Sequence, residues 1–166
     1  AYGSQMHAKY LARHPDAPDP HSEEEGKAGF SKEGKQAAEN SVVGRSRSVC
    51  AEIEGQLATL YHRLRMLDPS TLWIGIGSAP SSNSTQCTTI DLNTATSESD
   101  SHPKWLVYPP DNAKGVYLLM EPENPLSVPE EAEGKVGYPV TLSFFNDALE
   151  IKDVRATLSE ASSNPR

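Results

Sequence analysis

The sequence predicts an α+β fold in which a mixed helix–strand part is followed by a small all-β part. The strongest helical periodicity of the chain runs from about 49 to 66, and two apolar strand patterns follow it at 72–77 and 86–92. From 105 onward the apolar residues alternate with period two, which is typical of strands. We therefore expect an N-terminal domain at 1–95, a linker at 96–104, a β-rich module at 105–158 and a tail at 159–166.

The first predicted helix covers 2–13 and carries its apolar side chains on one face. Pro15 ends it, because proline disfavours helical conformation at the residue before it. Residues 15–29 contain proline, glycine and charge without periodicity and predict a loop, in which we interpret the acidic run 23–25 as solvent-exposed. Ser31 is placed to cap the short helical turn that follows.

The helix predicted at 49–66 has one apolar face and one face of small side chains. The apolar face consists of Ile53, Leu57, Leu60, Tyr61 and Leu64. The opposite face consists of Ala51, Gly55, Ala58 and His62. Side chains this small suit either the close approach of another backbone or the wall of a cleft. Pro69 ends the element.

Several strands follow this helix. In the pattern at 72–77, Gly75 and Gly77 indicate a buried strand that another chain segment approaches closely. A second strand is expected at 86–92. Further strands are predicted at 105–108, 115–120, 138–145 and 149–158, the last with a bulge near Lys152.

The composition excludes several classes of protein. The chain has 23 acidic and 15 basic residues and a net charge of -8 at pH 7, so its overall charge repels nucleic-acid phosphates. No apolar run reaches the roughly 18 residues that a transmembrane helix needs. The sequence contains neither a glycine-rich phosphate-binding pattern nor the Gly-x-Ser-x-Gly nucleophile pattern. We therefore expect no nucleic-acid partner and no transmembrane span.

Two histidines and one carboxylate form the best candidate site. His62 ends the face of small residues, Glu39 precedes an apolar pair, and His21 lies in the loop upstream of both. If these side chains converge on one cleft, their nitrogen and oxygen atoms suit zinc or another divalent metal. The alternative is a buried polar network that holds loops together. The cysteines Cys50 and Cys87 allow either one disulfide or two separate thiols.

A His-Arg pair at 62–63, a leucine-rich turn with Pro69 and a glycine-containing strand at 74–77 resemble the pattern of bacterial CAP-superfamily domains. This superfamily comprises cysteine-rich secretory proteins, insect antigen 5 and plant pathogenesis-related proteins. Upstream, the segment 38–42 resembles its Gly-Glu-Asn motif, and His21 resembles the histidine that precedes that motif.

The resemblance covers about residues 1–92 and implies an α-β-α sandwich of CAP type, with a further helix ahead of Ala1. It implies a cleft that can hold zinc or another divalent ion. The implied cleft residues are His21, Glu39 and His62, supported by Asn40 and Arg63. It also implies secretion or attachment to the cell envelope. A disulfide between the two cysteines would fit such an oxidising compartment.

The function that follows from this resemblance is that of a non-enzymatic extracellular module. Its cleft would bind a small ligand, a peptide or a divalent metal, and the β-rich module would attach it to a cell-envelope partner. Two alternatives stay open. One is a metal-dependent hydrolase that uses the same histidines and glutamate to activate water. The other is a structural module with no active site.

Overall fold

The computed structural model describes residues 1–82, 84–96, 103–120, 123, 136–145, 152, 153, 155 and 157. The first part of the chain contains α1 (Tyr2–Arg13), α2 (Lys32–Ala38), β1 (Ser41–Ser46), α3 (Val49–Ala58), α4 (Leu60–Met66), β2 (Thr71–Pro80) and β3 (Gln86–Thr96). The later strands are β4 (Trp105–Tyr108), β5 (Leu119–Met120), β6 (Val136–Gly137) and β7 (Thr141–Phe144). The fold is therefore mixed α+β, as expected.

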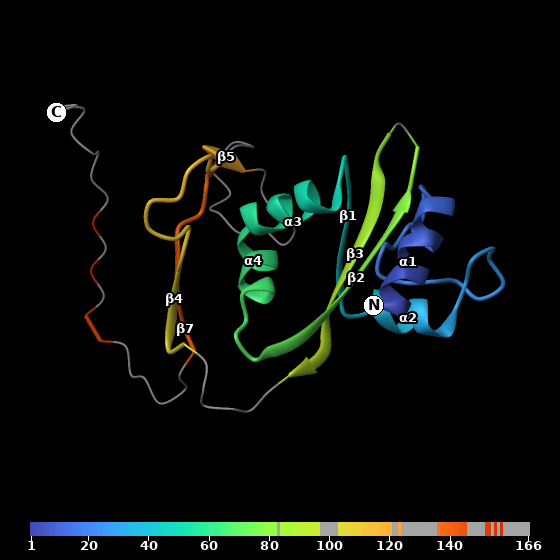
Figure 1. Cartoon of the computed structure of the whole chain (residues 1–166), viewed down its shortest axis with the longest axis horizontal. Helices are drawn as coiled ribbons and strands as arrows, with labels where there is room; N and C mark the ends of the chain where they lie inside the picture. Colours follow the sequence, from blue (N-terminus) through green and yellow to red (C-terminus); the bar gives the residue numbers. More distant parts are fainter. Residues whose placement is uncertain are drawn as a thin grey trace.

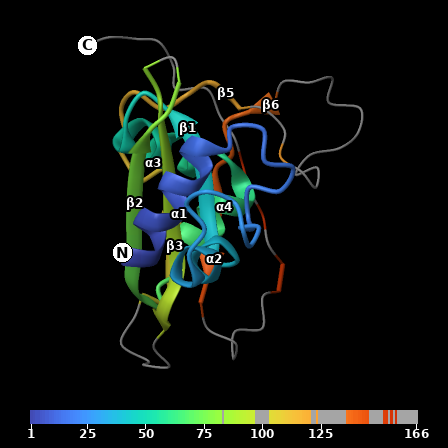
Figure 2. The ribbon, with the colours of Figure 1, turned by 90° about the vertical axis from the view of Figure 1, so that its right-hand side faces the viewer.

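A three-stranded antiparallel sheet in the order β1-β3-β2 forms the centre of the first part. Helices α1 and α2 cover one face of this sheet, and α3 and α4 lie on the other side (Figure 1). Seen from the side of α1, this helix lies across β2 and β3 (Figure 2). On the α1 side, Tyr10 and Leu11 pack with Cys87. On the α3 side, Val42, Ile90 and Leu92 form a second cluster.

The glycines of β2 allow α1 to lie directly on the sheet. A Cβ atom added to Gly77 would collide with the backbone of Ser4 and Gln5, and one added to Gly75 would meet the side chain of Ser4. The prediction that another segment passes close to these glycines is confirmed. The Gln5 side chain then binds the strand backbone: its Nε2 donates to the Ser78 carbonyl (2.7 Å), and its Oε1 accepts from the Ser78 N–H (3.2 Å).

The strand at 72–77 is confirmed, but its burial was predicted wrongly. β2 is an edge strand, and α3 lies mainly against β1 and β3. Leu72 is 56% exposed, Trp73 is 71% exposed and Ile74 is 52% exposed. Only the face toward α1 is covered closely, because that is where the glycines admit the helix.

The single helix predicted at 49–66 is two helices, α3 and α4. Thr59 separates them with an extended backbone conformation (φ -95°, ψ 159°). The apolar periodicity continues across this break, which is why the sequence pattern does not show it. The predicted cap at Ser31 is confirmed, because its hydroxyl accepts from the Gly34 N–H (3.0 Å). Helix α4 ends before Pro69, as predicted.

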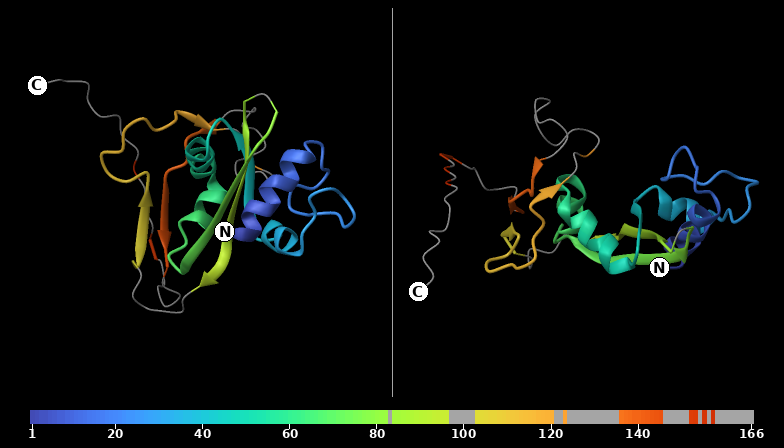
Figure 3. Two further views of the ribbon diagram at one scale, coloured as in Figure 1. Left: turned by 45° about the vertical axis from the view of Figure 1, so that its right-hand side comes forward. Right: turned by 90° about the horizontal axis from the view of Figure 1, so that it is seen from above.

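The later part of the chain forms two small antiparallel ribbons, β4 with β7 and β5 with β6. They lie beyond α4, on the side away from the central sheet (Figure 3). The strand predicted at 115–120 is only two residues long, and that predicted at 138–145 is confined to β7. The strand predicted at 149–158 falls largely outside the described residues.

The close approach of α1 to β2 predicts opposite effects of alanine at two glycines. Gly77→Ala places a methyl group against the α1 backbone and is expected to lower the free energy of unfolding by about 1–3 kcal/mol. Gly55→Ala is the control. Gly55 lies within α3 with open space around it, so alanine there is expected to raise that free energy by about 0.5–1 kcal/mol.

Urea titration of both variants measures the two effects. Equal stability of Gly77→Ala and the unmodified chain would mean that α1 does not lie on β2 as described.

Candidate functional site

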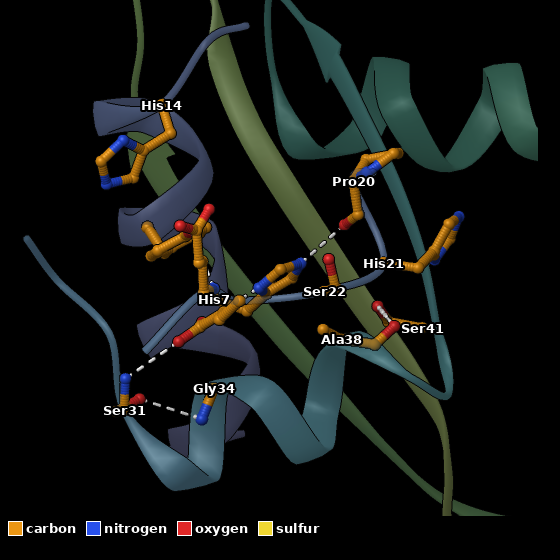
Figure 4. A network of polar contacts seen from close by, with 12 residues as sticks. His7, His14, Pro20, His21, Ser22, Ser31, Gly34, Ala38 and Ser41 are labelled. Carbon is orange, nitrogen blue, oxygen red and sulfur yellow. Dashed lines mark hydrogen bonds and ion pairs between the residues drawn. The ribbon is translucent and has the colours of Figure 1, made fainter. Parts of the chain in front are cut away.

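The most deeply buried polar contact joins His7 of α1 to Glu23 of the following loop. His7 Nδ1 lies 3.0 Å from Glu23 Oε1, and both side chains are fully buried. His7 Nε2 lies 2.8 Å from the Pro20 carbonyl oxygen, and Glu23 Oε2 accepts the Ser31 N–H at 2.9 Å (Figure 4). The pair therefore ties the helix to the middle of the loop that follows it and to the start of α2.

These contacts fix a proton at the pair. A carbonyl oxygen can only accept, so Nε2 of His7 must carry a hydrogen to bind Pro20. Nδ1 then binds Glu23 either as the N–H of an imidazolium facing a carboxylate, or as a lone pair facing a protonated carboxyl. Both arrangements hold one shared proton and no net charge, which is the condition for burying such a pair.

This pair was missed in the sequence, where the run 23–25 was interpreted as solvent-exposed. Glu24 and Glu25 are exposed, but Glu23 is 3% exposed. The available signal was His7, which falls on the same helical face as Tyr10 and Leu11. A polar side chain on an apolar helical face requires a buried partner.

His21 and Glu39 occupy exposed positions. The His21 ring points away from His7, and its backbone N–H donates to Asp19 Oδ1 at 2.8 Å (Figure 4). Glu39 is the C-cap residue of α2. Asn40, predicted as a supporting residue, is exposed as well, and its carbonyl oxygen accepts the Leu92 N–H at 3.3 Å.

His62 has a different carboxylate partner from the one expected. Its Nδ1 lies 3.2 Å from Glu123 Oε1 and 3.0 Å from Thr59 Oγ1, and its side chain is 42% exposed. Glu123 is nearly buried and accepts the N–H groups at the start of α4, from Leu60 (2.6 Å) and Tyr61 (3.0 Å). A residue 61 positions away in sequence from His62 thus caps the helix that carries it.

Arg63, the other predicted supporting residue, is fully buried and structural. Its guanidinium lies over the rings of both Tyr108 and Tyr138, 4.7 Å from each ring centre. Its Nε donates to the Leu57 carbonyl at 2.7 Å, and its Nη1 donates to the Pro139 carbonyl. It therefore joins α4 to the later strands.

The structure does not bring His21, Glu39 and His62 together as a metal-ligand set. Within the described ranges, no three His, Cys, Asp or Glu side chains are placed to hold one metal ion. The cysteines are free thiols: Cys87 is buried against α1, and Cys50 is exposed on α3, on the other side of the sheet.

A pocket of about 310 Å³ lies where the end of α1 and the next loop meet β1 and β3. Its lining residues are Leu11, Pro15, Ala17, Pro20, Val43, Gly44, Arg45 and Cys87. Arg45 supplies the one charged side chain in this lining. Its Nε donates to Cys87 Sγ (3.2 Å), Nη1 to the Pro15 carbonyl (2.9 Å) and Nη2 to the Leu11 carbonyl (3.2 Å). We call this cavity the Arg45 pocket.

Comparison with known proteins adds no relative. No family model, no curated protein and no solved structure matches the chain. In the part of the chain that the structure describes, no helix is both long enough and apolar enough to cross a membrane.

The pKa of Glu123 is below its usual value. Burial alone would raise this pKa, but the N–H groups of Tyr61 and Leu60, the Thr59 hydroxyl and the N–H of His62 favour the carboxylate and together outweigh burial. A lowered pKa in the folded state means that the cap stabilises the fold above the unfolded-state value of 4.5. This stability is lost as the pH falls through the lower folded-state pKa.

Glu123→Gln is therefore expected to lower the free energy of unfolding by about 1–2 kcal/mol near pH 7. The difference from the unmodified chain should disappear in acid, because protonated Glu123 is itself a neutral cap. Urea titrations across the acidic range measure both effects. Glu24→Gln is the matched control, since Glu24 pairs only with Lys27 at the surface and should change stability little. A pH-independent loss would contradict the capping role.

Proposed function

We propose that this chain is a non-enzymatic binding module of CAP-like fold that holds a small organic ligand in the Arg45 pocket. The observation that carries the proposal is the pocket itself, in which apolar side chains from four elements surround one charged group. Its volume is at the lower end of the range for small-molecule sites, and such sites are mostly apolar with few polar groups.

The layer order supports the CAP-like part of the proposal. Helices cover both faces of an antiparallel sheet, as the resemblance implies for an α-β-α sandwich. The His-Arg pair lies in α4, the helix that precedes the turn to β2. Secretion or attachment to the cell envelope, with a peptide or envelope component as a further partner, belongs to the same proposal and rests on the resemblance alone.

The second candidate is the metal-dependent hydrolase, and the contact of His62 with Glu123 favours it. A carboxylate on Nδ1 orients an imidazole and fixes its tautomer, as it does for catalytic and metal-bound histidines. Calorimetric zinc titration tests this candidate. Saturable heat that disappears in His62→Ala but persists in His14→Ala would support a site at His62, and no heat from the unmodified chain would reject it.

The binding function predicts that filling the Arg45 pocket removes ligand binding. Phenylacetate, phenylacetamide and 2-phenylethylamine are suitable probes because they share one apolar body and differ in the head group. We expect saturable binding of at least one of them in ligand-observed NMR. Ala17→Trp places an indole in the pocket lining and should weaken that binding at least about tenfold.

Ala28→Trp is the matched control, since Ala28 is exposed in the same loop and does not line the pocket. Thermal unfolding of both variants shows whether the fold is kept. The proposed function is wrong if none of the three probes binds the unmodified chain, or if Ala17→Trp binds them unchanged.

A further inference from the structure

We infer that the ligand of the Arg45 pocket is a compact organic acid, whose carboxylate pairs with the Arg45 guanidinium while its apolar body fills the cavity. This inference rests on the proposed function and adds the chemical class of the ligand. Three features support it: the unpaired charge of Arg45, the way its guanidinium is held, and the apolar character of the rest of the lining.

Arg45 has no acidic partner among the described residues. Its three hydrogen-bond acceptors, Cys87 Sγ and the carbonyls of Leu11 and Pro15, are all uncharged. Some other surface cations do have acidic partners: Lys27 pairs with Glu24 and Arg65 with Asp68. On a chain with a net charge of -8, a cation without an acid at the edge of a pocket favours an anionic ligand.

The guanidinium is held in place and still has donors to offer. An arginine has five N–H groups, of which the three contacts use one each on Nε, Nη1 and Nη2. Each terminal nitrogen therefore keeps a second N–H. Because two backbone carbonyls fix the plane of the group, a carboxylate gains two donors without ordering a long side chain.

The acceptors also explain why this cation stays at the pocket without a carboxylate. The Leu11 carbonyl belongs to the last turn of α1, where the helix dipole is negative and a cation is stabilised. Arg45 is an exposed residue, so water and an incoming acid reach its outer side. Its charge thus stabilises the helix end and is also available to a ligand.

The remaining lining selects the body of the ligand. Leu11, Val43 and two prolines present apolar surface, and Cys87 is fully buried at the contact of α1 with β3. A bare inorganic anion would leave these apolar walls in contact with water, so it gains only the charge interaction. An apolar acid gains both the charge interaction with Arg45 and the burial of its apolar surface against these walls. An apolar amine would place a second positive charge beside Arg45.

The affinities of the three probes for the unmodified chain directly test the chemical class of the ligand. Phenylacetate should bind at least about tenfold more tightly than phenylacetamide, and 2-phenylethylamine should bind most weakly. The preference for phenylacetate should decrease with added salt, because screening weakens an exposed charge pair. Sulfate at equal concentration should not displace phenylacetate.

Two variants of Arg45 test whether the preference for phenylacetate over phenylacetamide comes from that side chain. Arg45→Gln should reduce the ratio of the phenylacetate and phenylacetamide affinities to about one, and Arg45→Lys should keep phenylacetate the tighter ligand. The comparison on the unmodified chain needs no variant, so it stands if either substitution loosens the end of α1.

The results separate this inference from the proposed function. If phenylacetamide binds within twofold of phenylacetate, or if Arg45→Gln keeps the preference, the pocket binds small molecules but not acids as a class. If sulfate displaces phenylacetate equally, the site is one for bare anions and the inference is wrong. If none of the three probes binds the unmodified chain, the proposed function itself is wrong.

Discussion

The break between α3 and α4 is the constraint on which the association of the two parts of the chain depends. Thr59 leaves the helical path, so backbone groups on both sides of it lose their helical partners. Those groups are partly buried and must be satisfied. The Leu57 carbonyl accepts from Arg63 Nε at 2.7 Å and from the Tyr138 hydroxyl at 3.4 Å. The first N–H groups of α4 donate to Glu123.

Two of these partners, Glu123 and Tyr138, come from the later part of the chain, so the predicted β-rich module is bound to the helical layer by polar contacts. Glu123 supplies the cap, Tyr138 supplies a hydroxyl, and Pro139 supplies the carbonyl that accepts from Arg63. The rings of Tyr108 and Tyr138 both contact the Arg63 guanidinium. A buried cation held this way is stabilised by carbonyl oxygens and by the negative faces of aromatic rings rather than by a carboxylate. The division into separate domains stays a prediction, but the contacts across it are specific.

Local signals were sufficient for much of the fold. The helix at 2–13 has a clear apolar face, Ser31 is a side-chain cap, and the glycines of β2 mark a close approach. The first two depend on residues that are close together in sequence. The third depends on a close backbone approach that only glycine permits. The exposure of β2 could not be predicted from local sequence signals, because it depends on which strand lies at the sheet edge.

The candidate site was predicted less well, since it depends on pairs that are distant in sequence. His62 was predicted as a cleft residue beside Glu39, whereas the carboxylate that it contacts is that of Glu123. The periodicity of 49–66 hides the break that creates the need for Glu123. His7 and Glu23 are 16 residues apart and are joined by a loop without periodicity, so only the burial of His7 on its helix indicated a partner.

Two arginines show how the same chemistry leads to different roles. Arg63 and Arg45 both donate to backbone carbonyls, and neither has an ion-pair partner among the described residues. Arg63 is fully buried against two tyrosines, so no ligand can reach its charge. Arg45 is exposed on its outer side and lines an apolar cavity, and its carbonyl partners leave N–H groups unused. Burial, and not the charge itself, therefore decides that Arg63 holds the two parts of the chain together, while Arg45 keeps the exposure that the proposed acid ligand requires.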